Sequence, residues 1–156
     1  MVYHPLKNKD FDEFIAKMRS KFGAHLSTMK DTFRNMVRLK DELVATSLVA
    51  DQNPSPHTAF WTPFLAQQTP FFRGPAKLGQ KLNQPILYIR PKKIKRGYYS
   101  MSSSIIAENP NEVSEEQILK KYAQLLEKDI VENPAIWLWS HRRWKHKYED
   151  YHTSEK

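Results

Sequence analysis

Histidine is the residue type in this chain whose chemistry depends most on spacing. Each of the six histidines is a candidate general base or metal ligand. None lies in an H-E-x-x-H pattern or at another zinc-ligand spacing, and none has Asp or Glu five positions later, where a carboxylate would orient the imidazole. The chain also has no cysteine, which excludes thiolate nucleophiles and cysteine-bound zinc, and it has no glycine-rich phosphate loop. Residues 1–156 therefore contain no local histidine–carboxylate pair for base catalysis.

Asp51, followed by Gln52, is the strongest single polar candidate. It comes directly after the apolar run Leu43–Ala50, which is typical of a strand buried on both faces. Carboxylates at the C-terminal ends of such strands often lie at functional edges. Asp51 could orient a histidine, or it could hold a loop by accepting backbone N–H bonds, and both interpretations stay open.

The C-terminal segment Trp137–Lys147 combines three tryptophans with four lysines or arginines. Indoles at a membrane boundary and cations on lipid phosphates would suit this composition. The alternative is a terminal helix that packs its tryptophans on the core and leaves a solvated basic face.

A second basic segment, Arg90–Arg96, has five cations in seven residues. A hairpin turn with this charge could bind phosphate, although charged turns are usually only soluble. The following Tyr98 and Tyr99 would allow stacking on single-stranded nucleic acid, but they also alternate as strand residues do.

Composition and charge bound the class of protein. The 156 residues fit one domain, and 40% hydrophobic with 27% charged residues is typical of a globular chain. A formal net charge of +8 favours anionic partners, namely nucleic acid, lipid headgroups or phosphorylated substrates. No window approaches the roughly 18 apolar residues of a membrane span, so we expect any membrane role to be peripheral.

Helical periodicity and capping residues predict the helices. Ser114 and Gln117 form a capping box, Pro75 suits a first helical turn, and Asn133-Pro134 is a start signal for a final helix. The predicted helices cover residues 10–22, 28–39, 74–83, 114–130 and the segment after residue 134.

Short apolar runs predict strands at residues 43–50, 85–90 and 98–106, the last two pairing across a turn at 92–97. Residues 52–72 hold four prolines among aromatic residues, which predicts an ordered loop with at most a short strand at Phe60–Trp61. This order of elements predicts an α/β sandwich.

Six segments, in order along the chain, are similar to motifs of one family. They are Val2–Asn8 (V-Y-R-P-x-x-N), Leu48–Asn53 (a strand ending in D-Q or D-H), Phe60–Phe64 (F-V-P-F-F), Thr69–Leu78 (T-x-x-x-G-P-A-x-L-A), Pro85–Tyr88 (the next strand) and Asn133–Lys145 (P-x-Q-W-L-W-x-H-R-R-W-K). The chain therefore resembles the bacterial lipid A biosynthesis (lauroyl/myristoyl) acyltransferase family, a branch of the lysophospholipid acyltransferase superfamily.

This resemblance implies a partial glycerolipid-acyltransferase-like sandwich, with a central mixed sheet flanked by helices. It implies transfer of a fatty acyl chain from acyl carrier protein to a hydroxyl of an anionic glycolipid acceptor, a lipid A precursor or a related lipid. The implied place is the cytoplasmic face of the bacterial inner membrane, where the chain would be peripheral. No cofactor and no nucleic acid partner are expected.

In the family, the catalytic His-x4-Asp/Glu lies upstream of V-Y-R-P, and no residue precedes Met1 in this sequence. We therefore expect residues 1–156 to be the C-terminal portion of a single acyltransferase domain, without catalytic residues of its own and inactive alone. The family's arginine in V-Y-R-P is replaced by His4, which lacks the fixed charge and bidentate fork of arginine.

The candidate substrate-contacting or orienting residues are His4, Asp51, Gln52, Thr69, Arg73, Gly74, His141, Arg142 and Arg143. A different class of function stays open beside this one: a non-enzymatic basic module that binds anionic membrane lipid or nucleic acid.

Overall fold

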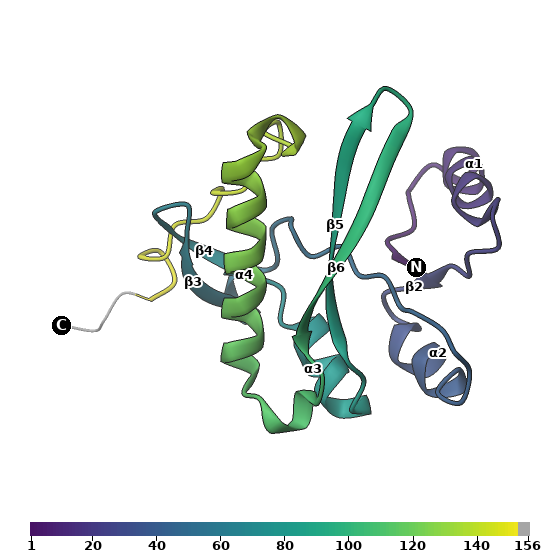
Figure 1. The fold of residues 1–156 in the computed structure, drawn as a ribbon, viewed down its shortest axis with the longest axis horizontal. Helices are drawn as coiled ribbons and strands as arrows, with labels where there is room; N and C mark the ends of the chain where they lie inside the picture. Colours follow the sequence, from purple (N-terminus) through teal and green to yellow (C-terminus); the bar gives the residue numbers. More distant parts are fainter. Residues whose placement is uncertain (153–156) are drawn as a thin grey trace. The chain divides into compact units, whose positions relative to one another are not determined.

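The structure, a computed structural model, describes residues 1–152 and comprises two compact units, Met1–Val49 and Ala50–Lys156 (Figure 1). The described residues form four α-helices and three two-stranded sheets, which confirms the α/β class. The central mixed sheet that we expected does not form in the described residues. Each sheet is a separate pair of strands, and no strand in the described residues has ladder partners on both sides.

The first unit contains a short parallel pair and two helices. Strand β1 (Val2–Tyr3) pairs with β2 (Ser27–Thr28). Helix α1 (Lys9–Ser20) begins at Asn8, whose side chain accepts the Phe11 N–H at 3.0 Å. Helix α2 (Thr32–Arg38) follows β2. Both helices were predicted, and both are shorter than their periodic patterns.

The strand predicted at residues 43–50 is wrong. The segment is irregular and largely exposed, with Val49 65% exposed. A strand buried on both faces needs neighbours that satisfy its backbone on two sides. Here the Val2 N–H donates to the Ser47 carbonyl at 3.0 Å, but no ladder forms in the described residues. Apolar composition alone therefore gave no strand.

The second unit opens with a hairpin that the sequence did not predict in full. After a 3-10 turn at Pro56–Thr58, β3 (Phe60–Phe64) pairs antiparallel with β4 (Gln67–Phe71). Its two-residue turn, Leu65-Ala66, has positive φ at both positions, 49° and 60°. This is the conformation that Asn-Gly usually supplies, so the turn carries no ordinary sequence signal.

Helix α3 (Gly74–Leu82) is confirmed, with Pro75 in its first turn and Asn83 in the left-handed conformation at its end. Gly79 is required by packing, because a Cβ there would lie 2.5 Å from Ile86 Cδ1. Close contact between α3 and the following strand therefore depends on a residue without a side chain.

The second hairpin of this unit is confirmed and is longer than expected. Strand β5 (Ile86–Lys95) pairs with β6 (Tyr98–Ala107), and the chain turns at Arg96-Gly97, with Gly97 at φ 80°. The cations predicted to occupy a turn at 92–97 therefore lie mostly on a strand.

Helix α4 (Glu115–Glu132) follows a 3-10 turn at Pro110–Glu112 and begins at the predicted capping box of Ser114 and Gln117. It lies beside the β3–β4 hairpin in Figure 1. The apolar core of the unit joins α4 to both hairpins and α3 through Phe64, Phe71, Ala76, Tyr88, Ile106, Ala107, Ile118, Leu119, Ala123, Leu126 and Ile130.

One polar group is buried in this core on α4. Asp129 accepts the Tyr88 hydroxyl at 2.6 Å and forms an ion pair with Arg90. Burial raises the pKa of Tyr88, and the bond to Asp129 raises it further. The phenol therefore stays protonated and fixes β5 against α4.

The final predicted helix is wrong. Only a 3-10 turn forms, at Pro134–Ile136, and the described chain is irregular from there to His152. Trp137, Arg143 and Trp144 of this segment instead contact the rest of the second unit through their side chains, as described below. Among residues 1–152, no helix has the length and apolar character needed to cross a bilayer.

Candidate functional site

Asn53, a residue that sequence reasoning did not select, connects the segment after residue 50 to residues 141–143. Its N–H donates to His141 Nε2 at 3.2 Å, and its Nδ2 donates to the Arg142 carbonyl at 2.5 Å. Its Oδ1 accepts from Arg143 at 2.8 Å. One asparagine thus fixes three consecutive residues, and the available signal was its position directly after Asp51-Gln52.

The bond from Asn53 makes Nε2 of His141 a hydrogen-bond acceptor. An imidazole nitrogen that accepts a backbone N–H carries no proton of its own. Nε2 of His141 therefore helps to hold the loop in this arrangement.

Arg143 is almost fully buried, with 1% of its surface exposed. Besides Asn53, it donates to the Pro70 carbonyl at 2.5 Å, and its guanidinium lies 4.8 Å from the centre of the Phe71 ring. Burial lowers the pKa of Arg143 to about 10. The group is therefore still charged at neutral pH, and its charge is used inside the protein.

Asp51 supplies the opposite charge in this region. Its field acts on Arg143, where it opposes the lowering of the pKa, and on Tyr122, whose pKa is raised first by burial and then by Asp51. Asp51 Oδ1 and Arg143 Nε are buried and have no hydrogen-bond partner in the described residues. The structure therefore brings the predicted residues Asp51 and Arg143 into one polar cluster, in which some of the polar atoms have no hydrogen-bond partner.

Thr69 is fully buried on β4 and belongs to the same end of the unit. Its hydroxyl donates to the Gln67 carbonyl at 3.0 Å and accepts the Trp144 indole N–H at 2.9 Å. Trp144 and Trp137 in turn lie 6.5 and 6.3 Å from the Phe64 ring centre. Thr69 therefore anchors the C-terminal segment, and its hydroxyl is occupied.

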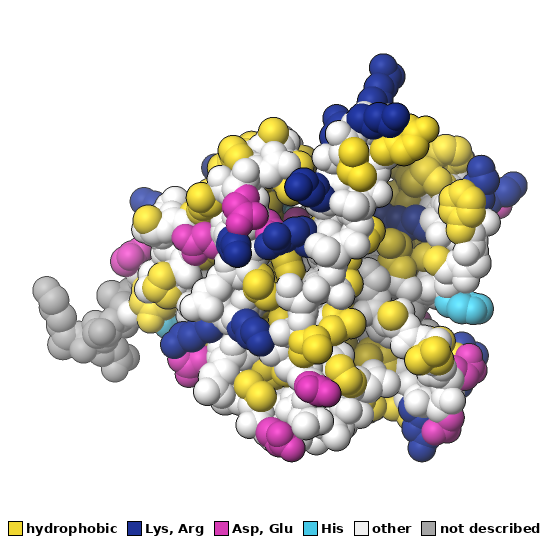
Figure 2. Space-filling view, in the orientation of Figure 1, with side chains coloured by type: hydrophobic (Ala, Val, Ile, Leu, Met, Phe, Trp, Pro, Cys, Tyr) yellow, Lys and Arg dark blue, Asp and Glu magenta, His cyan; other side chains and the backbone are white. Residues whose placement is uncertain are grey.

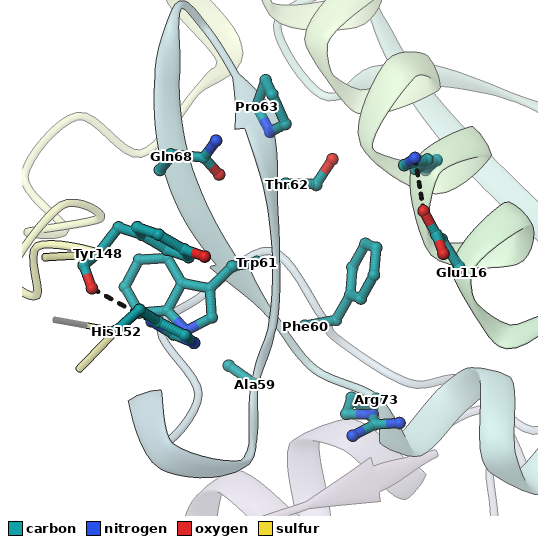
Figure 3. Close-up of a pocket in the computed structure, with 11 residues that line it drawn as sticks. Ala59, Phe60, Trp61, Thr62, Pro63, Gln68, Arg73, Glu116, Tyr148 and His152 are labelled. Carbon is teal, nitrogen blue, oxygen red and sulfur yellow. Dashed lines mark hydrogen bonds and ion pairs between the residues drawn. The ribbon is translucent and has the colours of Figure 1, made fainter. Parts of the chain in front are cut away.

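A pocket of about 440 Å³ lies on the β3–β4 hairpin (Figure 3). Trp61, Tyr148 and His152 gather on one side of the hairpin, and Arg73 and Glu116 lie on the other. The remaining lining residues are Ala59, Phe60, Thr62, Pro63, Gln68 and Lys120. The pocket thus combines aromatic walls with charged groups at its rim.

Arg73 is the cation of the predicted set that faces this pocket. It binds Glu115 with two hydrogen bonds, Nε to Oε1 at 2.5 Å and Nη2 to Oε2 at 2.8 Å. The bond raises the pKa of Arg73 and lowers the pKa of Glu115. Because the guanidinium has five donor hydrogens and Glu115 takes two, Arg73 keeps donors that could meet an anion.

Four other predicted residues are placed differently. Gly74 is the first residue of α3, and a Cβ there would meet nothing within 4 Å, so no close approach requires it. Gln52 and the Arg142 side chain are exposed. His4 belongs to the first unit, where it is exposed and its Nδ1 lies 2.8 Å from the Pro5 carbonyl oxygen.

Among the predicted residues of the second unit, His141 and Arg143 bond to Asn53, and Asp51 acts electrostatically on Arg143. Thr69 anchors Trp144, and Arg73 lines the pocket. Within residues 1–152, no group of three or more His, Asp or Glu side chains is arranged to hold a metal ion.

Comparison with known proteins agrees with the order of the motifs. A search of curated proteins found no match. The family model described as bacterial lipid A biosynthesis acyltransferase matches residues 1–146, which includes all of the first unit and most of the second. The chain therefore belongs to the bacterial lipid A biosynthesis acyltransferase family.

Proposed function

We propose that this chain forms the substrate-contacting part of an acyltransferase that moves a fatty acyl chain from acyl carrier protein to a hydroxyl of a lipid A precursor or a related anionic glycolipid. The observation that carries the proposal is the family match across residues 1–146. The proposed place of action is the cytoplasmic face of the bacterial inner membrane, with the chain as a peripheral component.

The pocket supports this proposal by its chemistry. An anionic glycolipid has phosphate groups next to acyl chains, and the pocket is lined both by the cations Arg73 and Lys120 and by the aromatic residues Phe60 and Trp61. Both cations have an acidic partner, Glu116 for Lys120 and Glu115 for Arg73, but the guanidinium keeps more free donor hydrogens than the ammonium, so Arg73 is the stronger candidate for phosphate. Planar guanidinium groups bind phosphate with two parallel hydrogen bonds.

Asn53 and its partners at residues 141–143, here called the Asn53 cluster, have a positioning role in this proposal. Arg143 and Asn53 hold β4 and the segment at residues 141–143 together, and β4 forms part of the hairpin that carries the pocket. His4 would contribute a hydrogen bond to substrate rather than a fixed positive charge. Loss of the cluster should therefore alter the pocket without removing a group that touches substrate.

The catalytic base is proposed to come from outside residues 1–156. The family uses His-x4-Asp/Glu, and no histidine of this sequence has that spacing. We accordingly propose that residues 1–156 are the C-terminal portion of one acyltransferase domain and do not catalyse transfer alone.

Transfer of a radiolabelled acyl chain from acyl carrier protein to a lipid A precursor tests this proposal. The purified chain should give no product, and adding a separately produced family segment that carries His-x4-Asp/Glu should restore transfer. Turnover by the purified chain alone would contradict the proposed division of roles.

Arg73 provides a second, independent test. Arg73→Gln should weaken binding of the phosphorylated precursor about tenfold, as expected for loss of one charge-assisted pair. Lys145→Gln removes an exposed charge outside the pocket and should leave binding unchanged. Equal effects of the two variants would remove the basis for a phosphate role at Arg73.

A non-enzymatic basic binding module is the second candidate, and one observation favours it. The β5–β6 hairpin presents exposed cations that take no part in the pocket. Binding of anionic vesicles with no acyl transfer, even after the motif-bearing segment is added, would support this candidate over the first.

A further inference from the structure

The end of the β5–β6 hairpin, here called the hairpin tip (residues 91–101), is the most exposed basic element of the second unit. Polar contacts to α4 come from Tyr88 and Arg90, which precede the hairpin tip on β5. Every residue of the hairpin tip is exposed, and in Figure 1 the tip extends past the end of α4. The tip therefore stands away from the core of its own unit.

The charge of the hairpin tip is uncompensated. It carries Lys92, Lys93, Lys95 and Arg96, and neither strand of the hairpin contains Asp or Glu. Figure 2 shows Lys and Arg side chains gathered at this end of the hairpin. In the part of the chain that the structure describes, none of the four forms an ion pair, although Lys95 lies 4.3 Å from the centre of the Tyr98 ring.

Large apolar and aromatic side chains accompany these cations. Ile94 is 68% exposed, Tyr99 63% and Met101 65%. The register places Pro91 opposite Met101 and Lys93 opposite Tyr99, so these four side chains share one face of the ladder. Ile94 and Met101 therefore place apolar surface beside the cations at the exposed end of the hairpin.

We propose that the hairpin tip is a docking element for anionic phospholipid bilayers. Lysine and arginine would meet the headgroup phosphates, tyrosine suits the interfacial layer, and Ile94 and Met101 would enter the acyl boundary. Single-stranded nucleic acid explains the cations and tyrosines but gives Ile94 and Met101 no partner. The inference rests on the proposed peripheral membrane location and names the surface responsible for it.

Charge neutralisation provides the first test. Full-length chain is sedimented with vesicles of phosphatidylcholine, alone or mixed with phosphatidylglycerol. The variant Lys92→Gln/Lys93→Gln/Lys95→Gln/Arg96→Gln should lose affinity for the anionic vesicles by more than about tenfold, since each cation near such a surface contributes about fivefold. The control Lys77→Gln/Lys128→Gln/Lys145→Gln/Lys147→Gln removes the same charge at exposed positions outside the hairpin and the pocket, and it should retain most of the binding.

A site-specific label provides the second test and needs no loss of binding. Because the chain has no cysteine, Ile94→Cys accepts a single environment-sensitive fluorophore. Its emission should shift to the blue with phosphatidylglycerol vesicles, while the same label at the exposed α4 position Gln124→Cys should not respond. Circular dichroism of each variant establishes that it is folded.

The outcomes separate this inference from the proposed function. Failure of the unmodified chain to bind any vesicle overturns both the peripheral location and the inference. Equal binding by the hairpin variant and the control, or no shift at Ile94→Cys, overturns the inference alone. Preference of the hairpin tip for a single-stranded oligonucleotide over vesicles also overturns it, whereas acyl transfer is measured separately and depends on neither result.

Discussion

The C-terminal segment 137–147 and the hairpin tip have similar compositions, but only the C-terminal segment has a cation buried in the second unit. Both are basic and aromatic, but Arg143 and Trp144 are fixed inside the second unit, whereas Lys92 to Arg96 are exposed. The difference lies in the partners within reach. Asn53, the Pro70 carbonyl and Thr69 satisfy the C-terminal segment, while the hairpin uses its backbone in its own ladder and leaves its side chains free.

This comparison shows that a basic aromatic segment does not by itself indicate a membrane surface. Burial of an arginine is favourable only where acceptors surround it. These acceptors lie in segments far away in the sequence. Composition alone therefore cannot distinguish segment 137–147 from the hairpin tip, whereas the structure can.

Arg143→Ala should give the largest effect on stability. It leaves Asn53 Oδ1 and the Pro70 carbonyl without their donor, and breaking such a buried charged contact costs about 3–5 kcal/mol of unfolding free energy. Urea denaturation measures the loss. Arg142→Ala, at the exposed neighbour, should change the stability by less than about 0.5 kcal/mol; equal losses would show that the buried guanidinium is not what holds the segment.

Asn53→Ala should follow in size. The variant removes one donor and one acceptor, and a bond to a charged group is the stronger of the two, so we expect a loss of about 2–3 kcal/mol. Gln52→Ala is the matched control, because Gln52 is adjacent and exposed. If the double variant of Asn53 and Arg143 loses as much as the sum of the single variants, the two residues do not act as a unit.

Trp144→Phe isolates the bond to Thr69, because the ring still packs near Phe64. Loss of the indole N–H should cost about 1 kcal/mol. Thermal unfolding of Trp144→Phe, Thr69→Val and the double variant measures the coupling between the two side chains. Absence of coupling would assign the stability of this contact to ring packing alone.

Arg73, which is partly exposed and paired with Glu115, is intermediate between the buried Arg143 and the exposed cations of the hairpin tip. Arg73 lowers the folded-state pKa of Glu115, so the pair stabilises the fold above the ordinary Glu pKa of 4.5, and this stabilisation disappears as the pH falls through the lower folded-state pKa. Since exposed pairs contribute little, the difference between the unmodified chain and Glu115→Gln should be below about 1 kcal/mol at neutral pH. A difference that persists in strong acid would exclude ionic pairing as its source.

Neutralising the four cations of the hairpin tip should have the smallest effect on stability. None contacts an acid in the described structure, so the unfolding free energy of the quadruple variant should change by less than about 0.5 kcal/mol. Chemical denaturation provides the measurement. A large loss would mean that these lysines are structural after all, and the contrast with Arg143 would fail.

Elements with local signals were predictable from the sequence. The Ser114–Gln117 capping box, Pro75 at the start of α3 and the turn before Tyr98 each depend on residues close together in the chain, and all three elements form. Segments that depend on distant partners were not predictable. Leu43–Ala50 has the composition of a buried strand but lacks a ladder, and Leu65-Ala66 turns without Asn or Gly.

The polar cluster shows the same limit at the level of single residues. Asp51, His141 and Arg143 were selected from their types and motif positions, and the structure brings them to one region. The role of Asn53 was missed, because its bond to Arg143 spans 90 positions and no local pattern encodes it. The roles proposed for these residues in binding substrate stay predictions.

The Asn53–Arg143 contact also has a consequence for biosynthesis. A ribosome makes residue 53 long before residue 143, and domains form as their segments emerge. The loop after residue 50 and the end of β4 therefore wait for their last partner until nearly the whole unit has been made, and closing so long a loop slows the final step of folding. During that interval the nascent chain exposes apolar surface that chaperones recognise, and premature termination before residue 143 would leave it in that state.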